Sequence, residues 1–337
     1  MQLNINTPGC YLSVKDQLFT IRSPADEKGE NYRFKHIPPQ KISSIIFNAT
    51  GSLSTAAITL ALEHHIDILF MEEGQKSLGR VWHGRPGSTT KIRKAQLLAS
   101  MDASGLDWVK GWIAQKLSNQ AAHLRALAVT QPEQAPALQE AAEKIIALGA
   151  AISTQEGEST EALADQIRGR EGSAGRQYFA ALSQALPEAW QFQGRSSRPA
   201  ADGFNALLNY GYALLYSRVE KALMVAGLDP FTGFLHRDDY NQLSMVYDFI
   251  EPYRVWVEEV VMQQFLGRKA PFGESMLNPS GKGVWLNEEG KKLIQSAFRK
   301  YMEDQPIAWK DSRRSRARII QLDAHHFANR LLDSMQD

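Results

Sequence analysis

The sequence predicts an α+β protein in which a β-rich N-terminal domain, sandwich-like with one helix, precedes a larger all-α domain. Residues 1–84 consist of short runs of β-forming residues, each bounded by Pro, Gly or Asn. The stretch GRPGSTT at 84–90 has the composition of a linker, and long helical patterns follow it. We therefore expect domains at 1–84 and 92–337, joined by a linker at 85–91. A chain of 337 residues with 43% hydrophobic residues is long enough for two such domains.

The first domain shows several strand signals and one change of period. Two β-forming runs surround the polar pair Lys15 and Asp16 in CYLSVKDQLFTIRS, which predicts a hairpin. YRFKHIP and KISSIIFNA predict further strands. Apolar residues then recur at helical spacing in STAAITLALEHH, with Ser54 at the N-cap position. IDILFME and SLGRVWHG return to the strand pattern.

The second domain reads as a series of helices. Residues 130–165 hold seven acidic residues and one lysine, which predicts a peripheral helix followed by a loop near STQEGEST. The segment GFNALLNYGYALLYSRVEKALMVAG is apolar all round, so we expect it in the core. The other predicted helices are TKIRKAQLLASM, GLDWVKGWIAQKLSNQAAHLRALA, LSMVYDFIEPYRVWVEEVVMQQFLG, LNEEGKKLIQSAFRKYMED (capped by Asn287) and SRRSRARIIQLDAHHFANRLL.

Composition excludes several classes of protein. The net charge is +1, from 38 basic and 37 acidic residues, so any nucleic-acid surface must arise from local segregation of charge. The single cysteine, Cys10, excludes an intramolecular disulfide framework and a cysteine-based zinc cluster. The N-terminus lacks a signal-peptide pattern, and no apolar run reaches the ~18 residues of a membrane span. We expect a cytoplasmic protein.

An acid pair next to a proline is the first candidate for chemistry. Asp248 and Glu251 are three residues apart, which places both carboxylates on one helix face. Pro252 has no N–H, so we expect a kink that re-aims both side chains. Like charges this close oppose each other's ionisation unless a cation lies between them. The alternative is a solvated acidic edge beside an ordinary proline bend.

A histidine and a glutamate extend this set. His236 ends GLDPFTGFLH, a turn between two core helices, and Glu171 lies among Arg168, Arg170 and Arg176. A carboxylate with arginines nearby suits a metal site for phosphate chemistry. Carboxylates with one imidazole favour Mn²⁺ or Mg²⁺ over structural zinc. The alternatives are a core or capping histidine and a surface ion pair.

Four stretches together resemble one known family. REGSAGRQYF, NALLNYGYALLY, GLDPFTGFLH and YDFIEPYR are similar to segments of the universal CRISPR adaptation integrase, the CRISPR-associated endonuclease that inserts new spacers into the repeat array. The similarity extends over most of the chain, from LSTAAITLALEHHIDILFMEEGQKSLGRVW to IIQLDAHHFANRLL. The resemblance implies a β-domain that forms a homodimer, a short linker and an α-helical catalytic domain. It also implies a small CRISPR-associated adaptation partner subunit.

The resemblance assigns roles to the candidate residues. It implies catalytic roles for Glu171, His236, Asp248 and Glu251, with Mn²⁺ or Mg²⁺ held by Glu171, His236 and Glu251. Asp248 is then expected beside the metal. Because many relatives carry Asp where Glu251 stands, Asp248 as the direct ligand remains an alternative. The implied reaction is attack by the 3′-hydroxyl of a double-stranded DNA fragment on a phosphodiester at the edge of CRISPR repeat DNA.

Basic residues gather in two stretches that could bind this DNA. Residues 85–125 hold seven basic and two acidic residues, and residues 291–318 hold nine basic and three acidic ones. The alternatives are a solvated tail for KDSRRSRAR and core packing for the two tyrosines below. The expected DNA-contacting residues are Arg93, Lys94, Arg176, Tyr216, Arg237, Tyr247, Arg254, Arg313, Arg314, Arg316 and Arg318.

Two other functions compete with the integrase. One is a non-catalytic nucleic-acid-binding scaffold, in which the acids and the histidine are structural. The other is a generic metal phosphohydrolase for small phosphoesters. The sequence lacks the paired His and Asp ligands on neighbouring helices that we expect of the latter.

Overall fold

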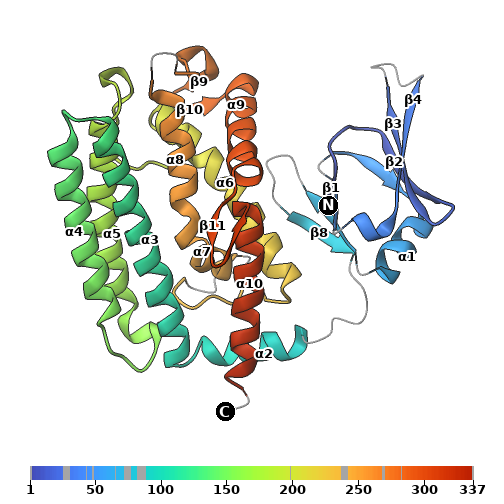
Figure 1. Cartoon of the computed structure of the whole chain (residues 1–337), viewed down its shortest axis with the longest axis horizontal. Helices are drawn as coiled ribbons and strands as arrows, with labels where there is room; N and C mark the ends of the chain where they lie inside the picture. Colours follow the sequence, from blue (N-terminus) through green and yellow to red (C-terminus); the bar gives the residue numbers. More distant parts are fainter. Residues whose placement is uncertain are drawn as a thin grey trace. The chain divides into compact units, whose positions relative to one another are not determined.

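The computed structural model divides into two compact units, Met1–Gly87 and Ser88–Asp337 (Figure 1). Each unit has its own buried apolar cluster. Helix α2 already begins at Thr89, so the last residues of the expected linker 85–91 are helical and the others lie outside the described residues. The structure describes residues 2–25, 31–42, 44–47, 49–64, 66–71, 77–81, 89–197, 199–236, 242–267, 270–281 and 283–335.

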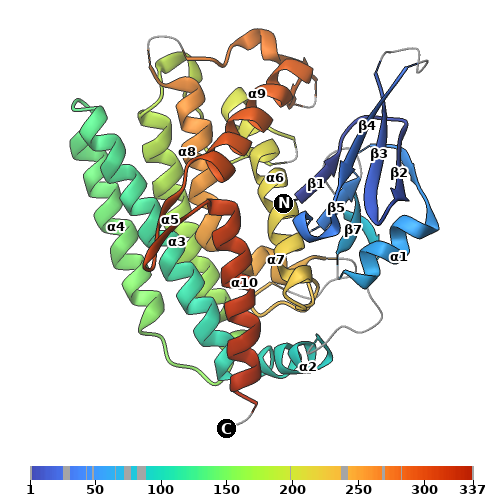
Figure 2. The same ribbon diagram turned by 45° about the vertical axis from the view of Figure 1, so that its right-hand side comes forward.

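The N-terminal unit contains two four-stranded sheets (Figure 2). One has the order β1-β5-β7-β8, with β8 antiparallel to three parallel strands, and the other has the order β4-β3-β2-β6. Helix α1 (Thr55–Glu63) contacts β2 of one sheet and β7 of the other. The strands are β1 (Gln2–Ile5), β2 (Cys10–Lys15), β3 (Leu18–Pro24), β4 (Tyr32–Ile37), β5 (Ser44–Phe47), β6 (Gly51–Leu53), β7 (Asp67–Met71) and β8 (Ser77–Val81).

Local signals account for most of this unit. Lys15 pairs with Leu18 across a two-residue turn, and Asp16 and Gln17 have φ angles of 50° and 59°. These angles match the twist of a tight hairpin, so the predicted hairpin is confirmed. The hydroxyl of Ser54 accepts the backbone N–H of Ala57 at 3.1 Å, which confirms the predicted N-cap. Strands β1 and β6 were not predicted, because runs of four and three residues carry little periodicity.

Long helices build the C-terminal unit. Helices α3, α4 and α5 lie side by side, and α6 packs against α8, α9 and α10 (Figure 1). Asn287 accepts the N–H groups of Glu289 and Gly290, which confirms the predicted cap of α9. The helices are α2 (Thr89–Ala99), α3 (Ala103–Thr130), α4 (Ala135–Ser153), α5 (Thr160–Gln184), α6 (Gly203–Val225), α7 (Ser244–Phe249), α8 (Arg254–Phe265), α9 (Glu288–Arg299) and α10 (Arg316–Asp333).

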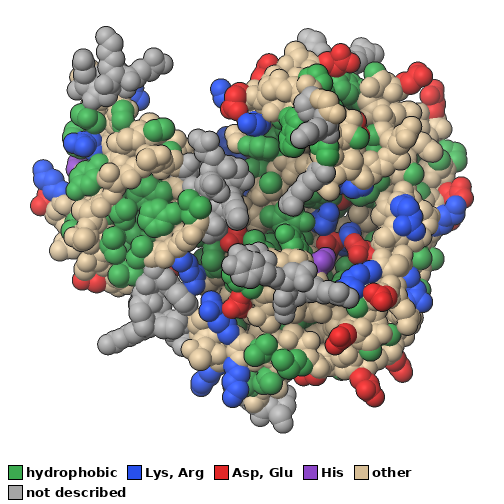
Figure 3. Space-filling model, turned by 180° about the vertical axis from the view of Figure 1, so that it is seen from behind, with side chains coloured by type: hydrophobic (Ala, Val, Ile, Leu, Met, Phe, Trp, Pro, Cys, Tyr) green, Lys and Arg blue, Asp and Glu red, His purple; other side chains and the backbone are tan. Residues whose placement is uncertain are grey.

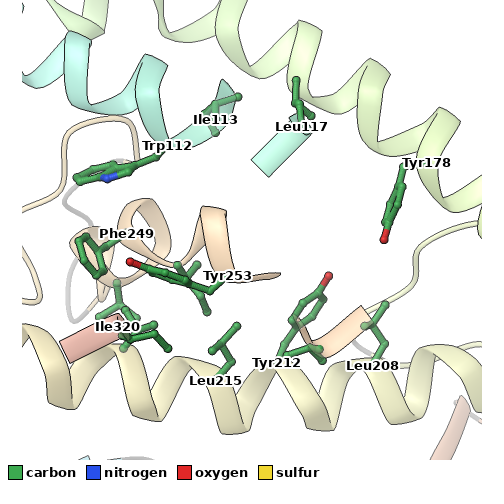
Figure 4. Packing of buried hydrophobic residues seen from close by; sticks show 14 of the residues in the cluster. Trp112, Ile113, Leu117, Tyr178, Leu208, Tyr212, Leu215, Phe249, Tyr253 and Ile320 are labelled. Carbon is green, nitrogen blue, oxygen red and sulfur yellow. The ribbon is translucent and has the colours of Figure 1, made fainter. Parts of the chain in front are cut away.

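The core of this unit lies between α3 and α6. In Figure 4, Trp112, Ile113 and Leu117 of α3 face α6, with Phe249 and Tyr253 between the two helices. All five side chains are nearly or fully buried. Such burial stabilises the fold by about 1.5–3 kcal/mol for each large apolar side chain. Among the described helices, none is both long and apolar enough to cross a bilayer.

In the described part of the C-terminal unit, which was predicted as all-α, two short hairpins lie between the helices. They pair β9 (Leu277–Ser280) with β10 (Gly283–Leu286), and β11 (Ile307–Trp309) with β12 (Ser312–Arg314). The second hairpin contains part of the basic run KDSRRSRAR, so this part of the run is a strand. These strands of three or four residues were not predicted, because the helical periodicity of the neighbouring segments dominates the pattern there.

The segment 243–267 was predicted as one kinked helix and is broken instead. Helix α7 ends at Phe249, Glu251–Tyr253 forms a 3₁₀ turn, and α8 begins at Arg254. Pro252 cannot donate the hydrogen bond that a continuous helix requires, and its ring crowds the preceding turn. The break separates the local backbone of Asp248 from that of Glu251.

Candidate functional site

Glu171 of α5 and Glu251 of the 3₁₀ turn meet at the ammonium group of Lys116 on α3. Nζ of Lys116 lies 2.5 Å from Oε2 of Glu251 and also contacts Oε1 of Glu171. The side chains of Lys116 and Glu251 are 8% and 4% exposed, and that of Glu171 is 25% exposed. The fold therefore brings two acids that are 80 positions apart in sequence onto one cation.

Helix α3 is anchored to the turn that carries Glu251. Nδ2 of Asn119, one helical turn after Lys116, donates to the carbonyl of Pro252 at 2.8 Å. Proline breaks the helix at this point, and the freed backbone region is held by an amide from the neighbouring helix. This hydrogen bond fixes the position of Lys116 along α3 relative to Glu251.

The charges of this cluster stabilise one another. Burial alone would raise the pKa of Glu251, but Lys116 and then Arg254 lower this pKa to about 2. Nη1 of Arg254 lies 3.1 Å from Oε1 of the same carboxylate. Burial opposes the charged form of Lys116, yet the attraction of Glu251 and Glu171 leaves its pKa above the ordinary value. Both Glu251 and Lys116 are therefore ionised at neutral pH.

Asp248 has a different environment from Glu251. Its carboxylate accepts the backbone N–H groups of Phe234, Leu235 and His236 at 2.5, 3.0 and 3.2 Å. Oδ1 of Asp248 also lies 2.6 Å from Nδ1 of His236. The carboxylate is thus fully engaged by the loop before α7, and its side chain is only 1% exposed. These contacts make Asp248 the residue that orients His236.

The imidazole of His236 is fixed by this contact. With Nδ1 directed at Asp248, we assign the proton to Nδ1, which leaves Nε2 as the free lone pair. Burial lowers the pKa of His236, but the hydrogen bond and the charge of Asp248 outweigh it and the net pKa is raised. A histidine oriented in this way by a carboxylate is the common arrangement of metal-binding histidines.

Two further side chains tie the loop 227–236 to the helices. The amide of Gln96 on α2, which is fully buried, donates to the carbonyls of Asp229 and Thr232 and accepts the N–H of Asp229, each at 2.8 Å. Nη2 of Arg168 on α5 donates to the carbonyl of Leu235 at 2.5 Å. The loop that carries His236 is therefore held by both α2 and α5.

Aromatic rings lie next to His236. The ring of Tyr247 is 5.7 Å from that of His236 and 5.3 Å from that of Tyr216, each pair in an edge-on arrangement. Both tyrosines are half-buried, so each has a packed side and an accessible side. The guanidinium of Arg254 lies 4.4 Å from the ring centroid of Tyr212. Arg254 thus already has two partners inside the protein.

The other predicted DNA-contacting residues fall into distinct environments. Arg93 is half-buried, with Nη1 3.9 Å from Asp229. Arg237 lies outside the described residues. Those with exposed side chains are Lys94, Arg176, Arg313, Arg314 and Arg318.

Arg316 does not belong to the exposed group. It is buried, donates to the carbonyls of Tyr301 and Gln305 at 3.2 and 2.9 Å, and stacks 3.7 Å from the ring centroid of Tyr301. Its position at the start of α10 explains the difference, because there the side chain turns inward to bind free carbonyls. The prediction that Arg316 contacts DNA is therefore corrected.

The residues fit a divalent cation in their chemistry. Within the described ranges, no group of three or more His, Cys, Asp or Glu side chains is closed around one point. Two carboxylates nevertheless converge on one cationic group, and Oε2 of Glu251 is buried without a hydrogen bond of normal geometry. Carboxylate oxygens with one imidazole nitrogen are donors that Mn²⁺ and Mg²⁺ accept.

Sequence reasoning missed Lys116 and Gln96. Lys116 was counted only as one of seven basic residues. The sequence pattern that could have identified Lys116 is its position on the apolar face of α3, which Trp112, Ile113 and Leu117 define. A lysine on such a face requires acidic partners, because an unpaired buried charge is costly. Figure 3 shows a histidine with acidic and basic side chains around it on one face of the helical unit.

The chain matches one protein family over most of its length. The family described as "CRISPR associated protein Cas1" matches residues 3–300. The "CRISPR-associated endonuclease Cas1 1" of Archaeoglobus fulgidus is 33% identical over 276 residues, which cover 79% of this chain and 78% of that protein. The protein with the same description from Thermus thermophilus is 32% identical, over 88% of this chain and 85% of that protein.

Solved structures share the fold over nearly the whole chain. A CAS1 protein from Thermotoga maritima matches with a TM-score of 0.71 and 17% identity, over 98% of this chain and 96% of that one. A casposase bound to its integration product matches with a TM-score of 0.72 and 22% identity, over 99% and 91% of the two chains. A partial Cas6-RT-Cas1–Cas2 complex matches with a TM-score of 0.74 and 18% identity, over 99% and 96%. The predicted fold class, strand-rich and then helical, is confirmed.

Proposed function

This chain belongs to the Cas1 family of CRISPR-associated proteins, and from that premise we propose that it is a metal-dependent DNA integrase and endonuclease. It joins the 3′-hydroxyl of a short double-stranded DNA fragment to a phosphodiester at the edge of a CRISPR repeat. Curated relatives are described as endonucleases, and a casposase with the same fold is bound to an integration product. These descriptions support both hydrolysis and strand transfer.

The observation that carries the proposal is the convergence of Glu171 and Glu251 on one cationic group, beside a histidine held by Asp248. Two neighbouring carboxylates, one of them buried, do not both stay ionised without a cation between them. The arrangement therefore suits a site for a divalent cation, with Glu171, His236 and Glu251 as ligands and Asp248 as the residue that orients His236. This assignment keeps the sequence-based choice of Glu251 as the direct ligand.

Each residue of the site has a specific role in this reaction. When bound, Mn²⁺ or Mg²⁺ at this site stabilises the charge that develops on the phosphoryl oxygens. Asp248 engages Nδ1 of His236, so Nε2 is the nitrogen that would bind the cation. Arg254 holds Oε1 of Glu251, so Oε2, which pairs with Lys116 in this structure, is the oxygen that would bind the cation. Tyr216 and Tyr247 offer ring surfaces beside His236 on which a base or sugar of the DNA end can pack.

The joining step balances without an external energy source. The 3′-oxygen of the fragment forms a bond to phosphorus, and the bond from phosphorus to the 3′-oxygen of the repeat strand breaks. The proton of the attacking hydroxyl is lost to solvent, and the leaving oxygen takes one up. One phosphodiester replaces another, so attack by water in place of the hydroxyl gives the endonuclease reaction.

DNA binding is assigned to the exposed basic residues. Arg313 and Arg314 lie on the hairpin β11–β12 and Arg318 on the first turn of α10, so they form one exposed basic segment. Lys94 and Arg176 extend the exposed basic surface of α2 and α5. Contacts from such residues neutralise phosphates and give salt-dependent affinity. Arg316 is left out of this surface.

Two protein partners complete the proposal. A solved complex of the same fold contains Cas1 together with Cas2, which supports a small CRISPR-associated partner subunit for this chain. We also assign homodimer formation to the N-terminal unit, as the family resemblance implies. In such an assembly two active sites would act on the two ends of one fragment.

The test is a strand-transfer assay with the full chain, a short duplex with free 3′-hydroxyls and a supercoiled plasmid that carries a CRISPR array. It is run with Mn²⁺, with Mg²⁺ and with a chelator, each with and without the Cas2-type subunit. Joined product that requires a divalent cation supports the integrase. DNA binding without any joined or cleaved product, with the cognate subunit present, would instead support a nucleic-acid-binding scaffold.

A further inference from the structure

Lys116 has a position that the proposed reaction does not explain by itself. Its ammonium lies between the two carboxylates that we assign to the divalent cation. We propose that Lys116 is a positioning residue that holds Glu171 and Glu251 in place of the divalent cation, and that it turns to a DNA phosphate when cation and DNA bind together. This inference rests on the proposed function and adds a coupling between the two ligands.

Lys116 is built to pair with these two acids. It lies on the buried face of α3, between Ile113 and Leu117, where an unpaired ammonium would be costly. Its partner Glu251 has one oxygen paired with Arg254, while Oε2 has Lys116 as its ion-pair partner at 2.5 Å. The same ammonium contacts Oε1 of Glu171. One positive charge is thus shared by two carboxylates.

The two cations compete for the same oxygens. A divalent cation bound by Glu171 and Glu251 would lie next to the ammonium of Lys116, and the two positive charges would repel each other. Lysine can leave such a site because its ammonium is a compact charge on a flexible four-carbon stem. Arg254 cannot take the place of Lys116 between the two carboxylates, because its guanidinium is already held by Glu251 and the ring of Tyr212.

The displaced ammonium needs a new anion. Asp248 is not available, because its carboxylate accepts three backbone N–H groups and contacts His236. Glu258 is fully buried, and its Oε1 accepts the hydroxyl hydrogen of Tyr212 at 2.6 Å. Its Oε2 has no hydrogen bond of normal geometry among the described residues, so Glu258 is the internal alternative that the experiment below separates from DNA. The phosphate of a DNA strand at the site is an anion that a lysine binds well as a point charge. We therefore assign this phosphate as the second partner of Lys116.

The exchange links the two binding equilibria. In the wild type, a DNA phosphate binds the ammonium of Lys116 once it leaves the two carboxylates. DNA should therefore increase the affinity for the cation, and the cation should increase the affinity for DNA by the same factor. Replacing Lys116 with a neutral residue removes the competitor. The variant should then bind the cation more tightly without DNA, and DNA should add little further affinity.

The experiment measures Mn²⁺ binding to the full chain from the electron paramagnetic resonance signal of free Mn²⁺. The probe DNA is a short duplex with 3′-dideoxy ends, which binds without joining. We compare wild type with Lys116→Met and Lys116→Gln. The matched control is Lys110→Met, because Lys110 is a half-buried lysine on the same helix that pairs with Asp107 and the carbonyl of Gln155.

We expect the dissociation constant for Mn²⁺ to fall about tenfold in Lys116→Met without DNA, a typical size for coupling between sites. The duplex should lower it by a similar factor in wild type and in Lys110→Met, and by less than about twofold in Lys116→Met. An equal or higher dissociation constant in Lys116→Met overturns the proposal. So does a full wild-type response to the duplex, which would mean that Lys116 turns to a group inside the protein such as Glu258.

The readout stays separate from catalysis. Circular dichroism checks that Lys116→Met is folded. If Lys116→Met does not fold, the comparison rests on Lys116→Gln, which has a neutral polar side chain. Strand transfer by the wild type tests the proposed function in its own assay. Absence of coupling in an active integrase would reject only the role of Lys116. Absence of strand transfer, with the coupling present, would reject only the integrase.

Discussion

Oδ1 of Asp248 lies 2.6 Å from Nδ1 of His236, and the same carboxylate accepts three consecutive backbone N–H groups of the loop that ends at His236. One buried acid therefore shapes the loop and aims its histidine. Glu251, three residues later, points its charge at Lys116 and Arg254 instead. The two acids have different partners because the helix that carries Asp248 ends before Glu251.

Replacing Asp248 with Asn tests its role as the orienting residue. An amide keeps the size of the side chain but supplies one acceptor oxygen in place of two and has no charge for the imidazole. We expect strand transfer to fall about 10–100-fold, as is typical when the partner of a metal-binding histidine is lost. The free energy of unfolding should fall by about 1–3 kcal/mol, measured by urea denaturation. A variant with wild-type strand transfer would contradict this role.

Stability should fall in mild acid because of His123. Its Nδ1 lies 2.7 Å from the hydroxyl of Tyr178, and burial lowers the pKa of His123 to about 4. The unfolded chain, in which the pKa of histidine is about 6.5, then binds a proton that the folded chain does not. Stability is therefore unaffected above the unfolded pKa and is lost as pH falls from 6.5 toward 4. Between pH 7 and pH 5 the loss from His123 is about 2 kcal/mol.

The matched variant for this pH effect is His123→Gln, which is neutral at every pH and can still contact Tyr178. Urea unfolding curves at pH 7 and pH 5 give the free energies for both proteins. The difference between the two pH values should be smaller in the variant by about 2 kcal/mol. An identical pH dependence in both proteins would show that His123 takes up its proton in the folded state.

Neutralising the exposed basic segment should weaken the salt dependence of DNA binding. Each phosphate contact that is lost reduces the slope of log K against log salt by about 0.9. For Arg313→Gln, Arg314→Gln and Arg318→Gln combined, we expect the slope to fall by about two to three units, measured by fluorescence anisotropy. Arg330→Gln is the control, since Arg330 is exposed at the other end of α10. An unchanged slope in the triple variant would place the DNA elsewhere.

Local features of the fold were predictable from the sequence. The turn at Asp16 and Gln17, the caps at Ser54 and Asn287 and the long core helix α6 depend on neighbouring residues. Strands of three or four residues were not predictable in this way, because so short a run has no measurable period. The helix break at Pro252 was expected only as a kink; in the structure α7 ends at Phe249 and α8 begins at Arg254, with Asn119 of α3 donating to the carbonyl of Pro252.

The residues of the proposed site were inferred from the sequence, but the contacts between them were not. The residue types and the resemblance pointed to Glu171, His236, Asp248 and Glu251. That Asp248 binds the loop while Glu251 faces Lys116 depends on packing between segments that lie far apart in sequence. Charge counting also treated Arg316 and Arg318 alike. Only the start of α10 separates them, because it turns one side chain inward and the other outward.

The central claim is that the site around His236 performs strand transfer, and His236→Ala tests it most directly. His326→Ala is the control, because His326 is an exposed histidine on α10. Both are compared with wild type for joined product in the presence of Mn²⁺ and the Cas2-type subunit, and for duplex binding. We predict that His236→Ala forms no joined product while it binds the duplex as wild type does, and that His326→Ala is fully active. Joined product from His236→Ala at the wild-type rate would contradict the claim.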